Sequence, residues 1–196
     1  VSCDLVIVVG GDGSMLNVSK YVASADVPVI GVNRGKLGFL TDILPDEIES
    51  KIDDVLSGSY SVEKRFLLDI FLLQDGDSEQ LGSALNDVVL HPGSAAQMIE
   101  FELFIDDTFV YSQESDGLII ATPTGSTAYA LSAGNLNHAL YPTDFPSPTC
   151  YDMLRRNYDW AGVLGAKKPF SWLLKIGISK FIILLSPSSL FSREQQ

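Results

Sequence analysis

The sequence is poor in cysteine and in positive charge. It has two cysteines, Cys3 and Cys150, and their spacing fits neither a zinc site nor a disulfide framework. Thirteen lysines and arginines stand against 25 aspartates and glutamates, so the net charge is -12. That balance excludes binding to nucleic acid or to an anionic membrane through a broad positive field. A polyanionic ligand must be held by local groups, and the scarcity of cysteine makes the cytoplasm the expected compartment.

A long apolar run and a signal-peptide pattern are also absent. Residues 172–185 are mostly apolar but contain Lys175 and Lys180, whereas a membrane-spanning helix needs about 20 consecutive apolar residues. The chain opens on Val1 and has no positively charged region before its first apolar run. We therefore expect no membrane partner and an N-terminus that has been cut. The 46% hydrophobic content is enough to bury a core.

The N-terminal part has the pattern of a βαβ unit. Residues 5–9 form a continuous apolar run, mostly β-branched, of the kind buried in a parallel sheet, and the glycine-rich loop Gly10–Gly13 ends it. Ser14 is the expected N-cap of the following helix, and the next strand is predicted from Pro28 onward. A second helix is predicted over 45–56, because it opens on proline with two acidic residues in its first turn.

From residue 61 the pattern changes to strands. The predicted strands are 66–73, 84–90, 98–105, 108–112 and 117–121, with a short helix at 128–132. The predicted fold class is therefore an α/β N-terminal part, a parallel βαβ unit that is incomplete, followed by a β-rich second domain that is truncated. The predicted domains are a partial α/β nucleotide-binding domain over 1–60 and a partial β-rich domain over 61–134.

The charge pattern changes abruptly after Gly134. Up to this residue the chain has 6 basic and 21 acidic residues, and from Asn135 it has 7 basic and 4 acidic residues. A frameshift or a wrongly joined reading frame would produce such a change, and a divergent domain is the alternative. Because prolines disfavour central strands, the three at 142, 146 and 148 lead us to expect a disordered or loosely collapsed segment over 135–196.

The strongest chemical signal is the loop Gly10–Gly13 between a strand and a helix. Glycines allow a phosphate to approach the backbone closely, and a helix N-terminus offers unpaired N–H groups. Asp12 is unusual in such a loop, because a carboxylate repels phosphate unless it accepts a proton from a hydroxyl or acts through a metal ion. This indicates phosphoryl transfer. A tight turn with Asp12 as a helix cap is the structural alternative.

Four ordered blocks together resemble the bacterial NAD kinase family. The blocks are GGDGS at 10–14, GVNRGKLGFLTD at 31–42, LNDVV at 85–89 and DGLIIATPTGSTAY at 116–129. Diacylglycerol and sphingosine kinases share the first block, whereas the last block is specific. The resemblance covers about 5–134 and implies an α/β domain and a β-rich domain with NAD bound between them. The family's preceding strand and its continuing strands after Gly134 are not found in this sequence.

The resemblance also implies a reaction. The γ-phosphate of ATP would be transferred to the adenosine ribose 2'-hydroxyl of NAD to make NADP, and Asp12 would be the catalytic residue that accepts the hydroxyl proton. ATP is the expected donor and a divalent metal ion, Mg²⁺, the expected cofactor, with no protein ligand to the metal assigned. Family members are homo-oligomers, so the full-length protein is expected to be one. A non-catalytic dinucleotide-binding remnant and a lipid kinase of the same superfamily are the alternatives.

The same resemblance assigns the NAD contacts. An amide beside a carboxylate, as at Asn86 and Asp87, can bind both sugar hydroxyls and a ring nitrogen, although a strand-end turn is the alternative. The hydroxyl-rich loop before Tyr129 can bind sugar and phosphate without positive charge. The predicted NAD-binding residues are Asp12, Gly13, Asn86, Asp87, Gln97, Asp116, Thr127, Ala128, Tyr129, Ala130, Leu131 and Ser132.

Overall fold

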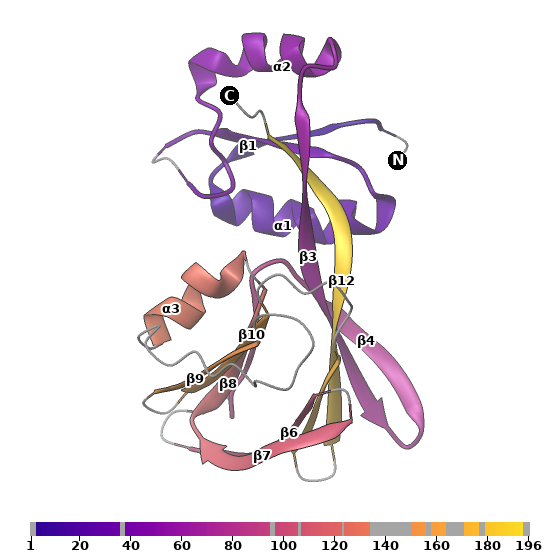
Figure 1. Ribbon diagram of the computed structural model, residues 1–196, viewed down its shortest axis with the longest axis vertical. Helices are drawn as coiled ribbons and strands as arrows, with labels where there is room; N and C mark the ends of the chain where they lie inside the picture. The colour runs from indigo at the N-terminus through magenta and orange to yellow at the C-terminus, as the bar shows by residue number, and fades with distance from the viewer. Residues whose placement is uncertain are drawn as a thin grey trace. The chain divides into compact units, whose positions relative to one another are not determined.

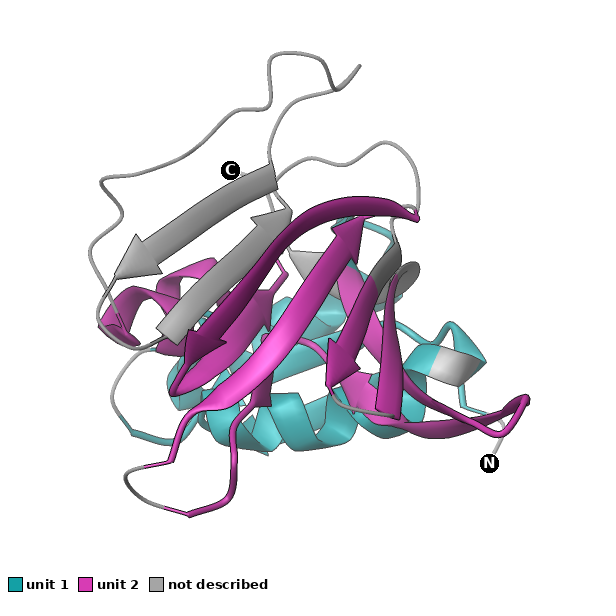
Figure 2. Ribbon diagram, turned by 90° about the horizontal axis from the view of Figure 1, so that it is seen from below, with its two compact units in different colours: residues 1–65, 187–196 teal, residues 66–186 magenta. Residues whose placement is uncertain are grey.

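A computed structural model gives the fold (Figure 1). It describes residues 3–35, 38–94, 97–105, 107–122, 124–133, 150–155, 158–163, 171–176 and 179–193. The chain divides into two compact units, one made of residues 1–65 with 187–196 and the other of residues 66–186 (Figure 2). No helix among the described residues is long and apolar enough to cross a membrane.

The first unit contains the predicted βαβ arrangement. Strand β1 (Val6–Gly10) is followed by helix α1 (Asp12–Val22) and strand β2 (Val29–Asn33). The strands β1 and β2 are parallel, with Val6 opposite Val29. All five residues of β2 are buried, which explains its continuous apolar sequence. The predicted α/β character of this part is confirmed.

The helix α1 begins three residues earlier than predicted. Gly11 is its N-cap, in an extended conformation, and the backbone N–H of Ser14 donates to the carbonyl of Gly11 at 2.9 Å. Ser14 therefore lies inside the first turn, and the prediction of Ser14 as the N-cap is wrong. The consequence is that Asp12 occupies the first helical position, where a negative charge interacts favourably with the helix dipole.

The rest of the first unit is built around β2. The chain passes from β2 through a 3-10 turn (Pro45–Glu47) into helix α2 (Ile48–Leu56), which agrees with the helix predicted over 45–56. Strand β12 (Ser179–Arg193) adds a parallel neighbour, since Phe191 lies opposite Val29.

The second unit is built from strands and confirms the predicted β-rich part. Strands β3 (Ser61–Gln74) and β4 (Asp77–Ala84) form one antiparallel pair, and β6 (Ile99–Ile105) and β7 (Thr108–Ser115) form another. A separate four-stranded sheet contains β5 (Asp87–Leu90), β8 (Gly117–Ala121), β10 (Tyr158–Val163) and β9 (Cys150–Arg155) in that order. The core of this unit contains Leu68, Phe101, Leu103, Ile105, Leu118, Ile120, Leu174 and Ile183.

One predicted strand is shorter in the structure than expected. Residues 84–90 do not form a continuous strand, because β4 ends at Ala84 and β5 begins at Asp87. The strand β4 was not predicted at all. Its residues are mostly exposed and polar, so it has no apolar alternation, and its pairing with β3 defines it instead.

The expectation for the C-terminal segment is wrong over its described residues. Strand β10 pairs in parallel with β8, so β8 has neighbours on both sides. Strand β11 (Ser171–Ile176) pairs with β6 and also with β12. The apolar run at 172–185 therefore contributes a β-hairpin. The three prolines used in the prediction, at 142, 146 and 148, lie outside the described residues.

Candidate functional site

The carboxylate of Asp12 is held by the loop that follows β2. Its Oδ2 accepts a hydrogen bond from the backbone N–H of Phe39 at 2.9 Å, and its Oδ1 accepts one from the N–H of Leu40 at 2.9 Å. The hydroxyl of Thr41 lies 3.4 Å from Oδ1. The structure therefore brings the glycine-rich loop and the second sequence block together within the first unit. Sequence reasoning did not identify these three partners of Asp12.

Glycine is required where this loop approaches Asp12. A Cβ added to Gly38 would overlap the carboxylate of Asp12, so any side chain there would displace it. A Cβ added to Gly13, in contrast, would meet nothing within 4 Å. Packing among the described residues therefore does not explain why position 13 is a glycine. The contact of Gly13 with NAD stays a prediction.

In the second unit, Asn86 lies in the turn that connects β4 to β5. Its backbone carbonyl accepts a hydrogen bond from the N–H of Thr122 at 2.8 Å. The hydroxyl of Thr122, which is completely buried, donates to the carbonyl of Leu85 at 2.5 Å and accepts from the N–H of Gly125 at 3.1 Å. A Cβ on Gly125 would overlap the Asn86 backbone. Thr122 and Gly125 thus fix the conformation of the turn. They were not predicted as site residues, although both belong to the TPTG sequence of the fourth block.

The side chain of Asn86 carries an unsatisfied acceptor. Its Oδ1 atom is buried and has no hydrogen-bond partner among the described residues. A buried acceptor without a partner costs about 1 to 3 kcal/mol. A donor group of a bound molecule would satisfy it, which fits the predicted binding role better than a simple turn.

The neighbouring carboxyl group of Asp87 is electrostatically perturbed. Burial raises the pKa of Asp87 above its ordinary value of 3.8, and a hydrogen bond from the backbone of Tyr129 opposes this rise. The same contact links the turn to helix α3 (Tyr129–Ala133). Asn86, Asp87 and the start of α3 therefore form one cluster within the second unit.

The perturbed pKa predicts that Asp87→Asn will stabilise the protein at pH 7. Because the folded-state pKa is raised, the native state binds more protons than the unfolded state between pH 3.8 and that pKa. Stability therefore falls as the pH rises through this window. The asparagine avoids the buried charge and can still accept the Tyr129 hydrogen bond. We expect thermal unfolding to show an increase in Tm at pH 7, on the order of 2 °C.

The pH dependence supplies the control for this prediction. Below pH 3.8 both proteins carry a neutral side chain at position 87, so the difference in Tm should vanish. Asp77→Asn, at an exposed position in β4, should leave Tm within about 1 °C at both pH values. An unchanged or lower Tm for Asp87→Asn at pH 7 would show that burial of the charge is not costly.

The predicted run 127–132 begins in a 3-10 turn (Gly125–Thr127) and continues into α3. Thr127, Tyr129, Leu131 and Ser132 are exposed, and Ala128 is half-buried. Ala130 is buried and packs with Ile119 and Ala121, so its side chain contributes to the core. The exposed ring of Tyr129 is compatible with the predicted ligand contact.

Two predicted residues of the second unit, Asp116 and Gln97, lie outside this cluster. Asp87 pairs with Ala121 at the end of β8, whereas Asp116 precedes the start of that five-residue strand. At about 3.3 Å per residue, roughly 16 Å separates the two ends. Gln97 is exposed in the loop before β6 and accepts a hydrogen bond from Ser94 at 2.6 Å. Only an extended ligand could contact Asp87 and Asp116 together.

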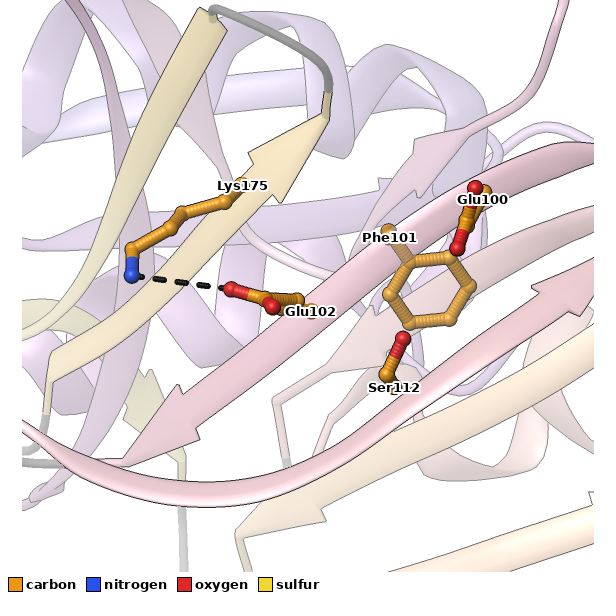
Figure 3. A pocket seen from close by; sticks show the side chains of 5 residues that line it. All are labelled: Glu100, Phe101, Glu102, Ser112 and Lys175. Atoms are coloured by element: carbon orange, nitrogen blue, oxygen red, sulfur yellow. Dashed lines mark ion pairs between the residues drawn. The ribbon is translucent and has the colours of Figure 1, made fainter.

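A separate hollow lies on the face of β6, β7 and β11 (Figure 3). It is lined by Glu100, Phe101, Glu102, Ser112 and Lys175, none of which is a predicted site residue. Lys175 Nζ lies 3.5 Å from the Glu102 carboxylate, and this partly exposed ion pair is of the kind that contributes little stability. No three acidic, histidine or cysteine side chains in the described parts of the chain converge on a position for a metal ion.

Comparisons with known proteins identify close relatives of this sequence. The ATP-NAD kinase N-terminal domain matches residues 1–60, and the ATP-NAD kinase C-terminal domain matches residues 85–142, past Gly134. The chain is 66% identical to the NAD kinase of Pseudomonas aeruginosa over 132 residues, which are 67% of this chain and 45% of that protein. The identity to the NAD kinase of Teredinibacter turnerae is 62% over 133 residues, covering 68% and 45%. The chain thus spans somewhat less than half the length of these curated relatives.

Solved structures support the fold. Yeast NADH kinase complexed with NADH matches with a TM-score of 0.69 at 23% identity, covering 96% of this chain and 60% of that one. An NAD kinase from Archaeoglobus fulgidus in complex with ATP matches with a TM-score of 0.67 at 24% identity, covering 98% and 78%. At these identities the similarity establishes the architecture of the chain.

Proposed function

Because the chain belongs to the ATP-NAD kinase family, we propose that it transfers the γ-phosphate of ATP to the adenosine ribose 2'-hydroxyl of NAD and so makes NADP. The observation that carries this proposal is the place of Asp12. Its carboxylate lies at the first position of α1, in a glycine-rich loop, with both oxygens oriented by hydrogen bonds. A fixed carboxylate beside an anion-binding helix terminus suits proton transfer during phosphoryl transfer.

In the proposed reaction the ribose 2'-oxygen attacks the γ-phosphorus while the bond from that phosphorus to the bridging oxygen of ADP breaks. The hydroxyl proton passes to the carboxylate of Asp12. A ribose hydroxyl is a poor nucleophile at neutral pH, so an oriented acceptor for its proton lowers the barrier. The N-terminal end of α1 favours the negative charge of the phosphates.

The proposed NAD site consists of the residues predicted from the sequence. Asn86 Oδ1, buried without a partner among the described residues, would accept a hydrogen bond from the ligand, and Asp87 beside it would accept another. Asp116 and Gln97 would contact other parts of the dinucleotide, which is long enough to extend beyond one cluster. Gly13 and the exposed side chains of the run 127–132 complete the proposed set.

The remaining features of the proposal come from composition and chemistry. Mg²⁺ would enter with ATP, since this ion usually binds substrate phosphates with one or two carboxylates and keeps several waters. When bound, it would neutralise phosphate charge at the proposed transfer, where Asp12 would accept the proton. The scarcity of cysteine supports a cytoplasmic location, and homo-oligomers are proposed for the full-length protein. The net charge of -12 argues against nucleic acid as a partner.

The decisive experiment compares three substrates in the presence of ATP and Mg²⁺. The chain should form NADP from NAD and should leave a diacylglycerol and a sphingoid base unphosphorylated. Phosphorylation of either lipid instead of NAD would assign the chain to the lipid kinases. NAD binding by calorimetry without any NADP would identify a non-catalytic remnant.

Replacement of Asn86 by alanine should weaken NAD binding. The ligand's donor would lose its buried acceptor, so we expect a loss of about 1 to 3 kcal/mol, or roughly 5- to 150-fold in Kd by calorimetry. Removal of this unsatisfied buried acceptor should not lower thermal stability, because Oδ1 has no hydrogen bond to lose among the described residues. Gln80→Ala, at an exposed position in β4 of the same unit, is the matched control and should keep the original Kd. Equal affinity in both variants would show that Asn86 is only a turn residue.

A further inference from the structure

The loop after β2 uses most of the hydrogen-bonding capacity of Asp12. An ionised carboxylate has about four lone-pair positions. Leu40 N–H and the Thr41 hydroxyl approach Oδ1, and Phe39 N–H approaches Oδ2. Among the described residues, one position therefore remains, on Oδ2. The arrangement leaves Asp12 able to accept one further hydrogen bond in a defined direction.

The three partners of Asp12 differ in how firmly they are held. Phe39 is 86% exposed, so its backbone belongs to a surface loop. Thr41 is completely buried. Exposed loop segments open more readily than buried ones, because they have few apolar contacts to lose. Leu40 is half-buried, so Thr41 is the most deeply buried of the three partners.

Thr41 is in turn fixed by Asn33 at the end of β2. Asn33 is only 1% exposed, and its Nδ2 donates to the Thr41 carbonyl at 3.1 Å and to the Thr41 hydroxyl at 3.3 Å. This leaves the hydroxyl proton of Thr41 free to point toward Asp12. A Cβ added to Gly31 would overlap Leu40 and Thr41, so the packing here is close. The contacts form a continuous path from Asn33 through Thr41 to Asp12.

We propose that Thr41 is a positioning residue for the phosphoryl transfer, acting by orienting the carboxylate of Asp12 from the buried core. The proposal rests on the proposed role of Asp12. Without the hydroxyl, the carboxylate is oriented by two backbone donors of a surface loop, and its free lone pair is no longer fixed toward the ribose hydroxyl. Small displacements of a reacting group cost large factors in rate, whereas binding of a long dinucleotide depends on many other contacts.

The kinetic test uses variants that separate the hydroxyl from the shape of the side chain. Thr41→Val keeps the shape, and we expect kcat for NADP formation to fall on the order of tenfold with KM for NAD within about twofold. Thr41→Ser keeps the hydroxyl and should recover most of the rate. Ser19→Ala removes another buried hydroxyl of the same unit, which donates to the Leu16 carbonyl and not to Asp12, and should keep the original kcat. A purely structural role would predict similar losses in Thr41→Val and Ser19→Ala.

A double-mutant cycle tests the contact without requiring turnover. Thr41→Val and Asp12→Asn are made singly and together, and the change in Tm is measured for each. Residues that share a hydrogen bond give non-additive effects, so the double variant should lose less than the sum of the single variants. Strictly additive Tm changes, or full kcat in Thr41→Val, would overturn the positioning role. If Asp12→Asn itself keeps full turnover, or the unaltered chain makes no NADP, the proposed function fails instead, and the cycle still decides the contact.

Discussion

Asp12→Asn will lower the rate of NADP formation by at least about 100-fold, the lower end of what a positioned general base contributes. The amide has nearly the shape of the carboxylate but cannot accept the ribose proton. Calorimetry should show that NAD still binds, because most of the proposed contacts belong to the second unit. Asp4→Asn, at an exposed position before β1, is the matched control and should retain full turnover.

The structure adds a second consequence to this variant. Both carboxylate oxygens of Asp12 accept hydrogen bonds from backbone N–H groups, at Phe39 and at Leu40. An asparagine can accept only one of them, because its amino group would face the other N–H. We therefore expect a modest decrease in Tm as well as the loss of turnover. Turnover equal to that of the unaltered chain would remove Asp12 from the chemistry, whatever the change in stability.

The first unit could be predicted from sequence because its signals are local. The run at 5–9 is continuously apolar and ends in glycines, and the structure places β1 and its turn there. The predicted burial of this run is wrong, because Ile7 and Val9 are exposed. The error at Ser14 has a physical cause. Gly11 caps the helix through its extended backbone and its carbonyl oxygen, and it has no side chain that would mark it as a cap in the sequence. Ser14 has the side chain typical of an N-cap and is therefore the residue that the sequence predicts instead.

The second unit shows what local patterns miss. Strand β4 is mostly exposed, so neither periodicity nor apolar content marks it. The pairing of β10 with β8 places Tyr158 opposite Gly117, residues far apart in the sequence. Such a pairing depends on how two strands that are distant in the sequence pack together, and not on the local pattern of either strand. A change in charge composition after Gly134 does not reveal it.

The site divides in the same way. The residue types of the predicted site could be read from the sequence blocks. The structure groups Asn86 and Asp87 with the start of α3, and their contact with NAD stays a prediction. The hydrogen bonds that orient the Asp12 carboxylate could not be predicted from the sequence, because their donors lie 27 to 29 residues further along the chain. The unsatisfied Oδ1 of Asn86 is a property of the packed state and has no counterpart in the sequence.

The largest effect on stability is expected from removal of residues 135–196. A chain ending at Gly134 loses β10 beside β8 and β11 beside β6, so two buried strands acquire open edges. It also loses Leu174 and Ile183, each 2% exposed in the core. Truncating one such side chain to alanine costs about 2 to 5 kcal/mol, against a total stability of about 5 to 15 kcal/mol for a typical domain. The shortened chain should therefore show no cooperative thermal transition and should aggregate.

Two single substitutions in the hairpin of β11 and β12 test whether the loss of stability comes from buried side chains, because one replaces a buried residue and the other an exposed residue. Leu174→Ala should lower Tm by several degrees, since removal of the buried side chain leaves a cavity. Lys180→Ala, at an exposed position in the same hairpin, should change Tm by no more than about 1 °C. The lysine lies directly opposite Lys175, so its removal also relieves a repulsion between like charges. If the chain ending at Gly134 unfolds cooperatively at the original Tm, and Leu174→Ala is as stable as the unaltered protein, then residues 135–196 contribute no strands to the fold and the expectation of a disordered segment is the correct one.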